Sequence, residues 1–127
     1  MGLLRFLMSF VPIEPRTFGD FMREVKLGAC TRVTISPYLK VSSANLSGSY
    51  IEIATGLECR AWTAAGRQIK GVFDSEREEG RRGASETDIL EVEMQRAIER
   101  QAERRRRILR ERMPELCVRV DSIALKF

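Results

Sequence analysis

Apolar and polar residues alternate through the middle of the chain with a period of two, the pattern of strands that bury one face. Val33 and Ile35 fall on one side of the first such segment, and Ile51 and Ile53 fall on one side of a later one. Turn-forming residues separate the segments. We expect strands over residues 31–36, 38–42, 49–54, 57–63 and 67–73. Strands spaced this closely form an antiparallel meander.

Helical signals precede this strand-rich region. Residues 2–10 are apolar enough to form a short helix. Thr17 then occupies the position of a helix N-cap, with Asp20 three residues later, as in a capping box. Gly28 follows the apolar residues of this second helix and is a typical stop. The chain is therefore expected to begin with short helical segments.

A much longer helix is predicted over residues 85–113. Ser85 is a suitable N-cap with an acid three positions later, and Pro114 prevents the helix from continuing. The stretch 74–83 before this helix is charged and contains glycine, so we expect it to be a loop.

Residues 116–127 are predicted to form the last strand, and the apolar set changes parity near Asp121 and Ser122, which indicates a bulge or bend. The chain, residues 1–127, is expected to be a single α+β domain: an antiparallel β-meander of about five strands, one long α-helix packed across it and a short helical N-terminus. The other sheet face would carry Glu52, Glu58, Arg60, Trp62 and Lys70. That face would be solvated or covered by a second subunit.

The long helix carries a narrow apolar stripe when it is drawn as a wheel at about 100° per residue. The stripe comprises Leu90, Met94, Ile98, Ala102, Leu109 and Met113. It is broken near Arg105 and Arg106, where an apolar residue would be expected. Such a break is typical of a helix seam, where an arginine packs its stem and keeps its charge in water, or pairs with a carboxylate across a dimer.

Five arginines of the same helix fall within about a third of its circumference. They form the Arg ridge, which comprises Arg96, Arg100, Arg104, Arg107 and Arg110. A ridge of this kind predicts contact with phosphates or with an acidic partner. The alternative is a solvated face, because nearby glutamates are spaced to pair with the ridge and basic residues late in a helix complement its dipole. Those glutamates are Glu93, Glu99, Glu103 and Glu111.

Charge and amino-acid composition limit the classes of function that the chain can have. The net charge is +4, with eighteen Arg and four Lys, and residues 104–112 alone hold six Arg and one Glu. Arginine suits bidentate contacts to phosphate or carboxylate, although a GC-rich genome also produces an arginine-rich composition. The absence of His excludes Cys–His and Ser–His–Asp catalysis, and no phosphate-binding glycine motif is present. We therefore expect neither an enzyme nor a bound cofactor or metal.

The three cysteines are Cys30, Cys59 and Cys117, and none has the spacing of a metal or redox motif. Small buried thiols in a reduced, cytoplasmic protein are the simplest interpretation. No stretch of sequence predicts a transmembrane segment, and the first residues lack a signal-peptide cleavage site.

These observations favour a non-catalytic protein–protein interaction or assembly module that forms a homo-oligomer. Trp62 would anchor an interface on the second sheet face. One alternative is a nucleic-acid-binding protein that uses the Arg ridge, although its helix lacks the aromatic residues of single-strand binders. The other is a small-ligand-binding domain with a pocket between sheet and helix. The expected partners are a second copy of the chain, a nucleic acid or an acidic protein.

Overall fold

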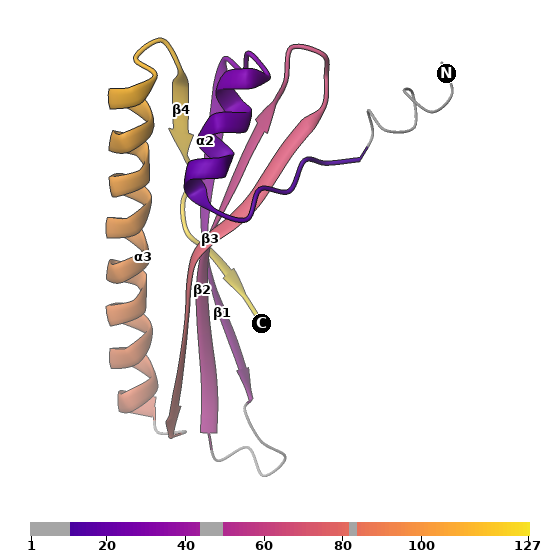
Figure 1. The fold of residues 1–127 in the computed structure, drawn as a ribbon. Helices are drawn as coiled ribbons and strands as arrows, with labels where there is room; N and C mark the ends of the chain where they lie inside the picture. The colour runs from indigo at the N-terminus through magenta and orange to yellow at the C-terminus, as the bar shows by residue number, and fades with distance from the viewer. Residues whose placement is uncertain (1–10, 44–49, 82–83) are drawn as a thin grey trace.

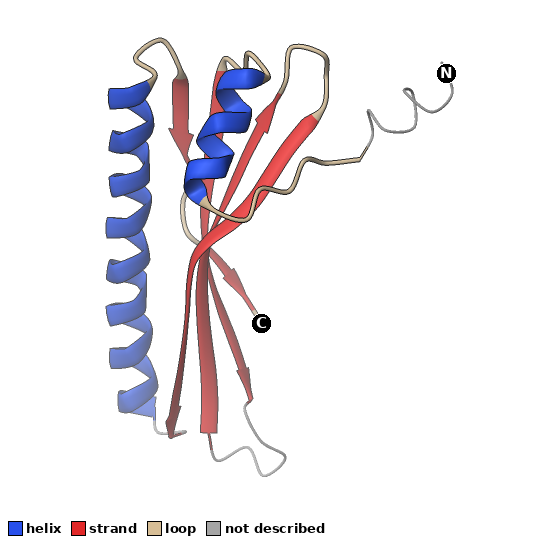
Figure 2. Ribbon diagram, viewed as in Figure 1, coloured by secondary structure: helices blue, strands red, loops and turns tan. Residues whose placement is uncertain are grey.

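The computed structural model describes residues 11–43, 50–81 and 84–127, which form two layers, a five-stranded sheet and two helices on one of its faces (Figure 1; Figure 2). The elements are α2 (Phe18–Leu27), β1 (Arg32–Ser43), β2 (Tyr50–Trp62), β3 (Gln68–Arg81), α3 (Ala84–Arg112), β4 (Cys117–Val120) and β5 (Ala124–Lys126). The α+β prediction is confirmed. The helix expected over residues 2–10 lies outside the described residues.

Local signals build α2. The hydroxyl of Thr17 accepts a hydrogen bond from the backbone N–H of Asp20 at 3.0 Å, which confirms the predicted N-cap. Gly28 caps the other end, as predicted. Three- and four-residue spacing gathers the apolar residues on one side of the helix. The buried residues of α2 are Phe18, Phe21 and Val25.

The sheet is mixed, so the prediction of a purely antiparallel sheet is wrong in part. β1, β2 and β3 form an antiparallel meander of three strands over the residues where five were predicted, because two pairs of predicted strands are each one continuous strand. β4 and β5 lie on the other side of β1 and run parallel to it. The reason is that α3 carries the chain back along the sheet after β3, and the chain then re-enters the sheet in the direction of β1. The order β3-β2-β1-β4 leaves β1 in the interior.

β1 passes through Pro37, where the sequence predicted a strand end. Pro37 is buried and pairs in register with Leu57 of β2. The carbonyl of Ile35 accepts a hydrogen bond from the N–H of Asp121 at 2.8 Å, and the backbone groups of Pro37, two residues on, face the same side. On that side the neighbouring strand is interrupted between β4 and β5, so no donor is needed from proline. The single strand predicted over residues 116–127 is therefore two short strands, and the break between them lies where the sequence predicted a bulge or bend, near Asp121 and Ser122.

β2 and β3 are also longer than predicted. β2 continues through the expected turn at Thr55 and Gly56, with a β-bulge at this point. β3 extends to Arg81 and so includes residues 74–81 of the stretch predicted as a loop, of which residues 76–81 pair in register with β2. An ion pair across these strands joins Arg77 to Glu52 at 3.1 Å. Pairing with a neighbouring strand has overridden the local turn-forming composition.

α3 lies on the same face of the sheet as α2 and completes the core. Its bounds confirm the long-helix prediction, but the helix begins at Ala84, so Ser85 lies inside it and is not the N-cap. The buried apolar residues of α3 are Met94, Ile98, Ala102 and Leu109. The inward sheet residues have the predicted parity and include Val33, Ile35, Ile53, Leu57, Cys59 and Ala61. Neither described helix combines the length and apolar character that crossing a bilayer requires.

An ion pair within the chain fills the break in the apolar stripe of α3. The Nε and Nη2 groups of Arg105 donate to the carboxylate of Asp74 in β3, at 2.7 and 2.6 Å. The guanidinium carbon lies 4.8 Å from the centre of the Phe18 ring. Asp74 has a φ of 53°, in the left-handed region that Asp tolerates better than most residues. The carboxylate expected across a dimer is therefore supplied by the same chain, and it joins α3 to β3 beside α2.

Candidate functional site

The sheet face opposite the helices, here named the open face, is uncovered in the part of the chain that the structure describes (Figure 2). Strand alternation places there the residues predicted from the sequence. Basic side chains outnumber acidic ones among the residues of this face whose side chains the structure describes. The basic residues are Arg32, Lys40, Arg60, Lys70, Arg77, Arg119 and Lys126, and the acidic residues are Glu52, Glu58 and Asp121.

A row of basic residues crosses the open face from strand to strand. Lys70 of β3 pairs in register with Arg60 of β2. Arg60 pairs with Thr34 of β1, and Thr34 pairs with Arg119 of β4. Lys70, Arg60 and Arg119 form the cation row, which spans about 15 Å at the usual distance between strands. Like charges directly opposite one another destabilise a sheet, so the row needs compensating carboxylates.

Glu58 compensates two members of the cation row. Its carboxylate oxygens lie 3.1 Å from Lys70 Nζ and 3.1 Å from Arg60 Nη2. Burial acts to raise the pKa of Glu58, but the hydrogen bond from Lys70 and the charge of Arg60 outweigh burial and lower that pKa below its ordinary value. Glu58 is therefore ionised at neutral pH and orients both basic side chains. Together, Lys70, Arg60 and Glu58 have a net charge of +1.

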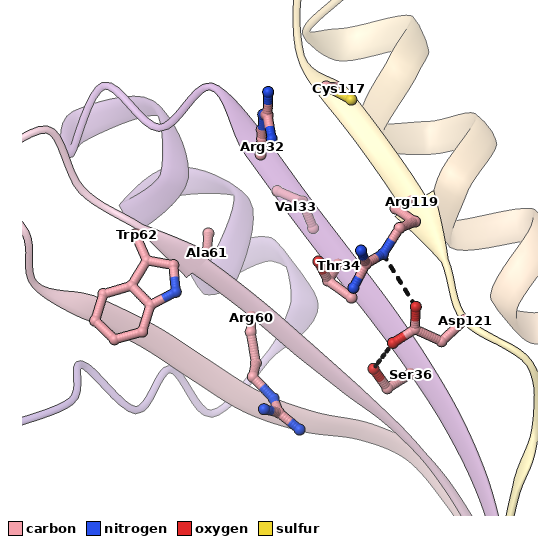
Figure 3. A pocket seen from close by; sticks show the side chains of 10 residues that line it. All are labelled: Arg32, Val33, Thr34, Ser36, Arg60, Ala61, Trp62, Cys117, Arg119 and Asp121. Atoms are coloured by element: carbon pink, nitrogen blue, oxygen red, sulfur yellow. Dashed lines mark hydrogen bonds and ion pairs between the residues drawn. The ribbon is translucent and has the colours of Figure 1, made fainter.

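Asp121 orients the third member of the row. Its Oδ1 lies 3.0 Å from Arg119 Nε, and its Oδ2 accepts a hydrogen bond from the Ser36 hydroxyl at 2.8 Å (Figure 3). The interruption between β4 and β5 supplies this carboxylate. The Arg119 side chain is nevertheless 72% exposed, so its guanidinium is both oriented and accessible.

Trp62 and Arg32 lie beside the cation row and line a shallow hollow of about 400 Å³. Figure 3 looks onto the open face, with the helices behind the sheet, and shows the indole ring nearly face-on. Trp62 is 60% exposed and belongs to neither core cluster. The other residues of the lining are Val33, Thr34, Ser36, Arg60, Ala61, Cys117, Arg119 and Asp121.

The Arg ridge lies on the side of α3 away from the sheet, and all five of its side chains are exposed. Within the described residues, no ion pair involves any of them. Glu103, one of the glutamates predicted to pair with the ridge, binds Arg106 instead, with Nε donating at 2.9 Å. This bond lowers the pKa of Glu103 and raises that of Arg106. The five ridge arginines thus have no direct ion-pair partner among the described residues, although Glu103 lies close enough to Arg107 and Arg110 for their charges to lower its pKa further.

Burial keeps the thiols of Cys30 and Cys59 in the neutral form. All three cysteines are unpaired. Burial raises the pKa of Cys59 to about 12 and also raises the pKa of Cys30, while Cys117 is exposed in the lining of the hollow. Over the described ranges, no group of Cys, Asp and Glu side chains is arranged to hold a metal ion.

A second hollow, of about 380 Å³, lies beside the C-terminal end of α2. Its lining is Val25, Lys26, Cys30, Met113, Pro114, Glu115 and Leu116. Small-molecule sites usually combine an apolar lining with a few convergent polar groups. Since Lys26 and Glu115 are both exposed, this hollow gives little support to the small-ligand hypothesis.

The strand pattern of the sequence predicts Arg60, Lys70 and Trp62 on one face, but it does not predict that Arg119 and Arg32 lie beside them, and so it does not predict the cation row. The row depends on the pairing of β1 with β4, which are far apart in the chain. The available signal was a basic residue at an outward position of each of these strands. Only the register shows that these positions are neighbours.

No protein-family model, no curated protein and no solved structure matches this chain. Its function must therefore be inferred from the geometry of the open face and of the Arg ridge.

Proposed function

We propose that this chain is a non-catalytic module that binds nucleic acid through its open face. The cation row carries the proposal, because its three basic groups lie in one line across the sheet, are oriented by carboxylates and are reached by solvent. Arg and Lys contacts to phosphates supply much of the affinity of proteins for nucleic acids. Oriented side chains also lose less conformational entropy when they bind.

The charge of the open face favours a polyanion over a second copy of the chain. Self-assembly through Trp62 would stack two such faces and bring two cation rows together, with Glu58 and Asp121 already engaged. Juxtaposed like charges oppose association. A nucleic acid is attracted by the same charges.

The Arg ridge is a second surface suited to the same class of partner. The distance from Arg96 to Arg110 is about 21 Å along the helix, which corresponds to about six phosphates of one strand. The ridge lies on the exposed side of α3, and α3 packs on the face of the sheet opposite the open face, so the ridge would contact a different segment of nucleic acid. We include it in the proposal as a site of phosphate contacts without base recognition.

The proposed module uses neither catalysis nor a cofactor. Its site consists of charged groups held in ion pairs and one exposed aromatic ring. We place it in the cytoplasm, a reducing compartment in which its three unpaired thiols would persist.

The test is the salt dependence of oligonucleotide binding, followed by fluorescence anisotropy. Three phosphate contacts to a single strand give a slope of about −2 for log K against log salt. Raising the salt from about 50 to about 200 mM should therefore weaken binding about 20-fold. Arg60→Gln combined with Arg119→Gln removes two contacts of the row and should therefore make the slope less steep by about 1.4.

The matched control combines Arg23→Gln with Arg106→Gln. It removes the same formal charge from the helix side, where each arginine is paired with an acid three residues away. Binding at the open face predicts that this control keeps the wild-type slope. Equal weakening of both double variants would show that only net charge matters and would refute the site, and a lack of binding by the wild-type protein would refute the function.

A further inference from the structure

We infer that Trp62 is a stacking site for one unpaired nucleobase, so that the open face selects single-stranded nucleic acid. This selectivity rests on the proposed function, because the cation row would hold the phosphates of the same strand. It adds the class of ligand, which phosphate contacts alone do not specify.

Trp62 presents a large aromatic surface that the fold does not use. Its side chain is 60% exposed, on the face of the sheet that the helices leave open, and it packs in neither core cluster. Figure 3 shows its ring nearly face-on in a view onto that face. A base stacks on an aromatic ring through this exposed surface, whatever its sequence, because every base has a π-face.

Tyr38 provides a comparison on the same face of the sheet. Its ring packs against Gly56, where an added Cβ would lie 2.4 Å from the Tyr38 hydroxyl oxygen. The ammonium of Lys126 lies 4.6 Å from the centre of the ring. Tyr38 is thus engaged within the fold, whereas no cation–π or ring–ring contact involves Trp62 in the described part of the chain.

A base on Trp62 would have basic groups on two sides for its phosphates. Arg60 lies two residues earlier on the same face of β2, about 7 Å away along the strand. Val33 and Ala61 form the first register pair of β1 and β2, and Arg32 and Trp62 are the next residues on these two strands. The two strands lie about 5 Å apart at this point. Arg32 is exposed and makes no ion pair with any described residue. The site therefore combines a stacking surface with a free cation and an oriented one.

A duplex cannot use this site unless it opens. Its bases are paired and stacked on one another, so exposing a ring face requires unstacking and unpairing. A single strand offers a free base to Trp62 and its phosphates to the cation row at once. We therefore expect the single strand to bind more tightly than a duplex of the same sequence, although the duplex has the higher charge density.

The chain contains one tryptophan, so its fluorescence reports directly on stacking at this residue. The first ligand is a single-stranded oligonucleotide of about 12 nucleotides, within the usual site sizes of single-strand binders. The second is an abasic oligomer of the same length, which keeps the sugar–phosphate backbone and lacks the bases. Stacking predicts that the first ligand quenches the fluorescence and that the second binds without quenching.

Two substitutions test the contribution of the ring by anisotropy. Trp62→Leu should weaken single-strand binding about fivefold to 150-fold, the equivalent of about 1–3 kcal/mol for one stacked base. The same variant should bind the abasic oligomer as the wild-type protein does. Trp62→Phe should recover part of the loss, because it keeps a ring for stacking.

The outcomes separate the stacking site from the proposed function. Equal binding of intact and abasic oligomers, without quenching, would overturn the stacking site and leave binding by the cation row intact. Failure of the wild-type protein to bind any oligomer would refute both. Because quenching is measured on the wild-type protein, the result does not depend on whether a variant folds.

Discussion

Replacing Asp74 by Asn should lower the free energy of unfolding by about 2 kcal/mol. Asn has nearly the shape of Asp and tolerates the left-handed backbone at this position, where φ is 53°. The substitution therefore removes the negative charge and changes little else. Arg105 would then be a partly buried cation without its ionised partner.

The magnitude follows from the burial of the pair. Removing one partner of a buried pair costs about 3–5 kcal/mol, whereas an exposed pair contributes at most about 1 kcal/mol. The side chains of Arg105 and Asp74 are 21% and 19% exposed, and the guanidinium also lies over Phe18. The expected loss lies between the two limits.

Urea unfolding at neutral pH, followed by circular dichroism, measures the effect as a lower midpoint with an unchanged m-value. Glu103→Gln is the control, because it breaks an exposed pair on the same helix and should change stability little. A loss below about 0.5 kcal/mol for Asp74→Asn would refute the reasoning, since the pair would then be no stronger than a surface contact. Adding Arg105→Met should recover part of the loss by completing the apolar stripe.

Three further predictions concern the open face and the ridge. The pKa of Glu58 is lower in the folded protein than its ordinary value of 4.5, so its ion pairs contribute stability that is fully present above that pH and is lost as the pH falls through the folded value. Glu58→Gln should therefore make stability less dependent on pH in acid, as measured by urea unfolding. Arg104→Gln with Arg107→Gln should reduce the salt slope of nucleic-acid binding, and an unchanged slope would remove the ridge from the proposal. Light scattering should give the same mass for wild type and Trp62→Ala. A lower mass for the variant would instead support self-assembly through the open face.

Local signals were sufficient for the helices. The cap at Thr17, the stop at Gly28 and the proline after α3 act within a few residues of each helix end, so the sequence alone indicates where the helices begin and end. The apolar periodicity of α3 likewise indicates which of its residues face the sheet. Arg105 interrupts that periodicity, and its partner could not be predicted because Asp74 lies in a stretch of composition typical of loops.

Continuous strands were predicted as separate short strands. The local rules that locate helix ends were also applied to strand ends, but pairing with neighbouring strands decides where a strand ends. Pro37 ends a strand only if its missing donor is needed, and the interruption beside it removes that need. Gly56 lies inside β2 with the Tyr38 ring against it, not in a turn. Parallel pairing of β4 with β1, and with it the cation row, is a property of the register, which no local pattern contains.

β1 is synthesised long before the strand that covers its outer edge. Ser36 and Asp121, which share a hydrogen bond, are 85 residues apart, so this pairing raises the contact order and is expected to form late in folding. Until it forms, the edge of β1 is a template on which other chains can aggregate. Pro37 withholds a donor in the middle of that edge, so a foreign strand cannot build a continuous ladder there. The native strand is interrupted at the same place, and the nascent chain is therefore protected without weakening the finished sheet.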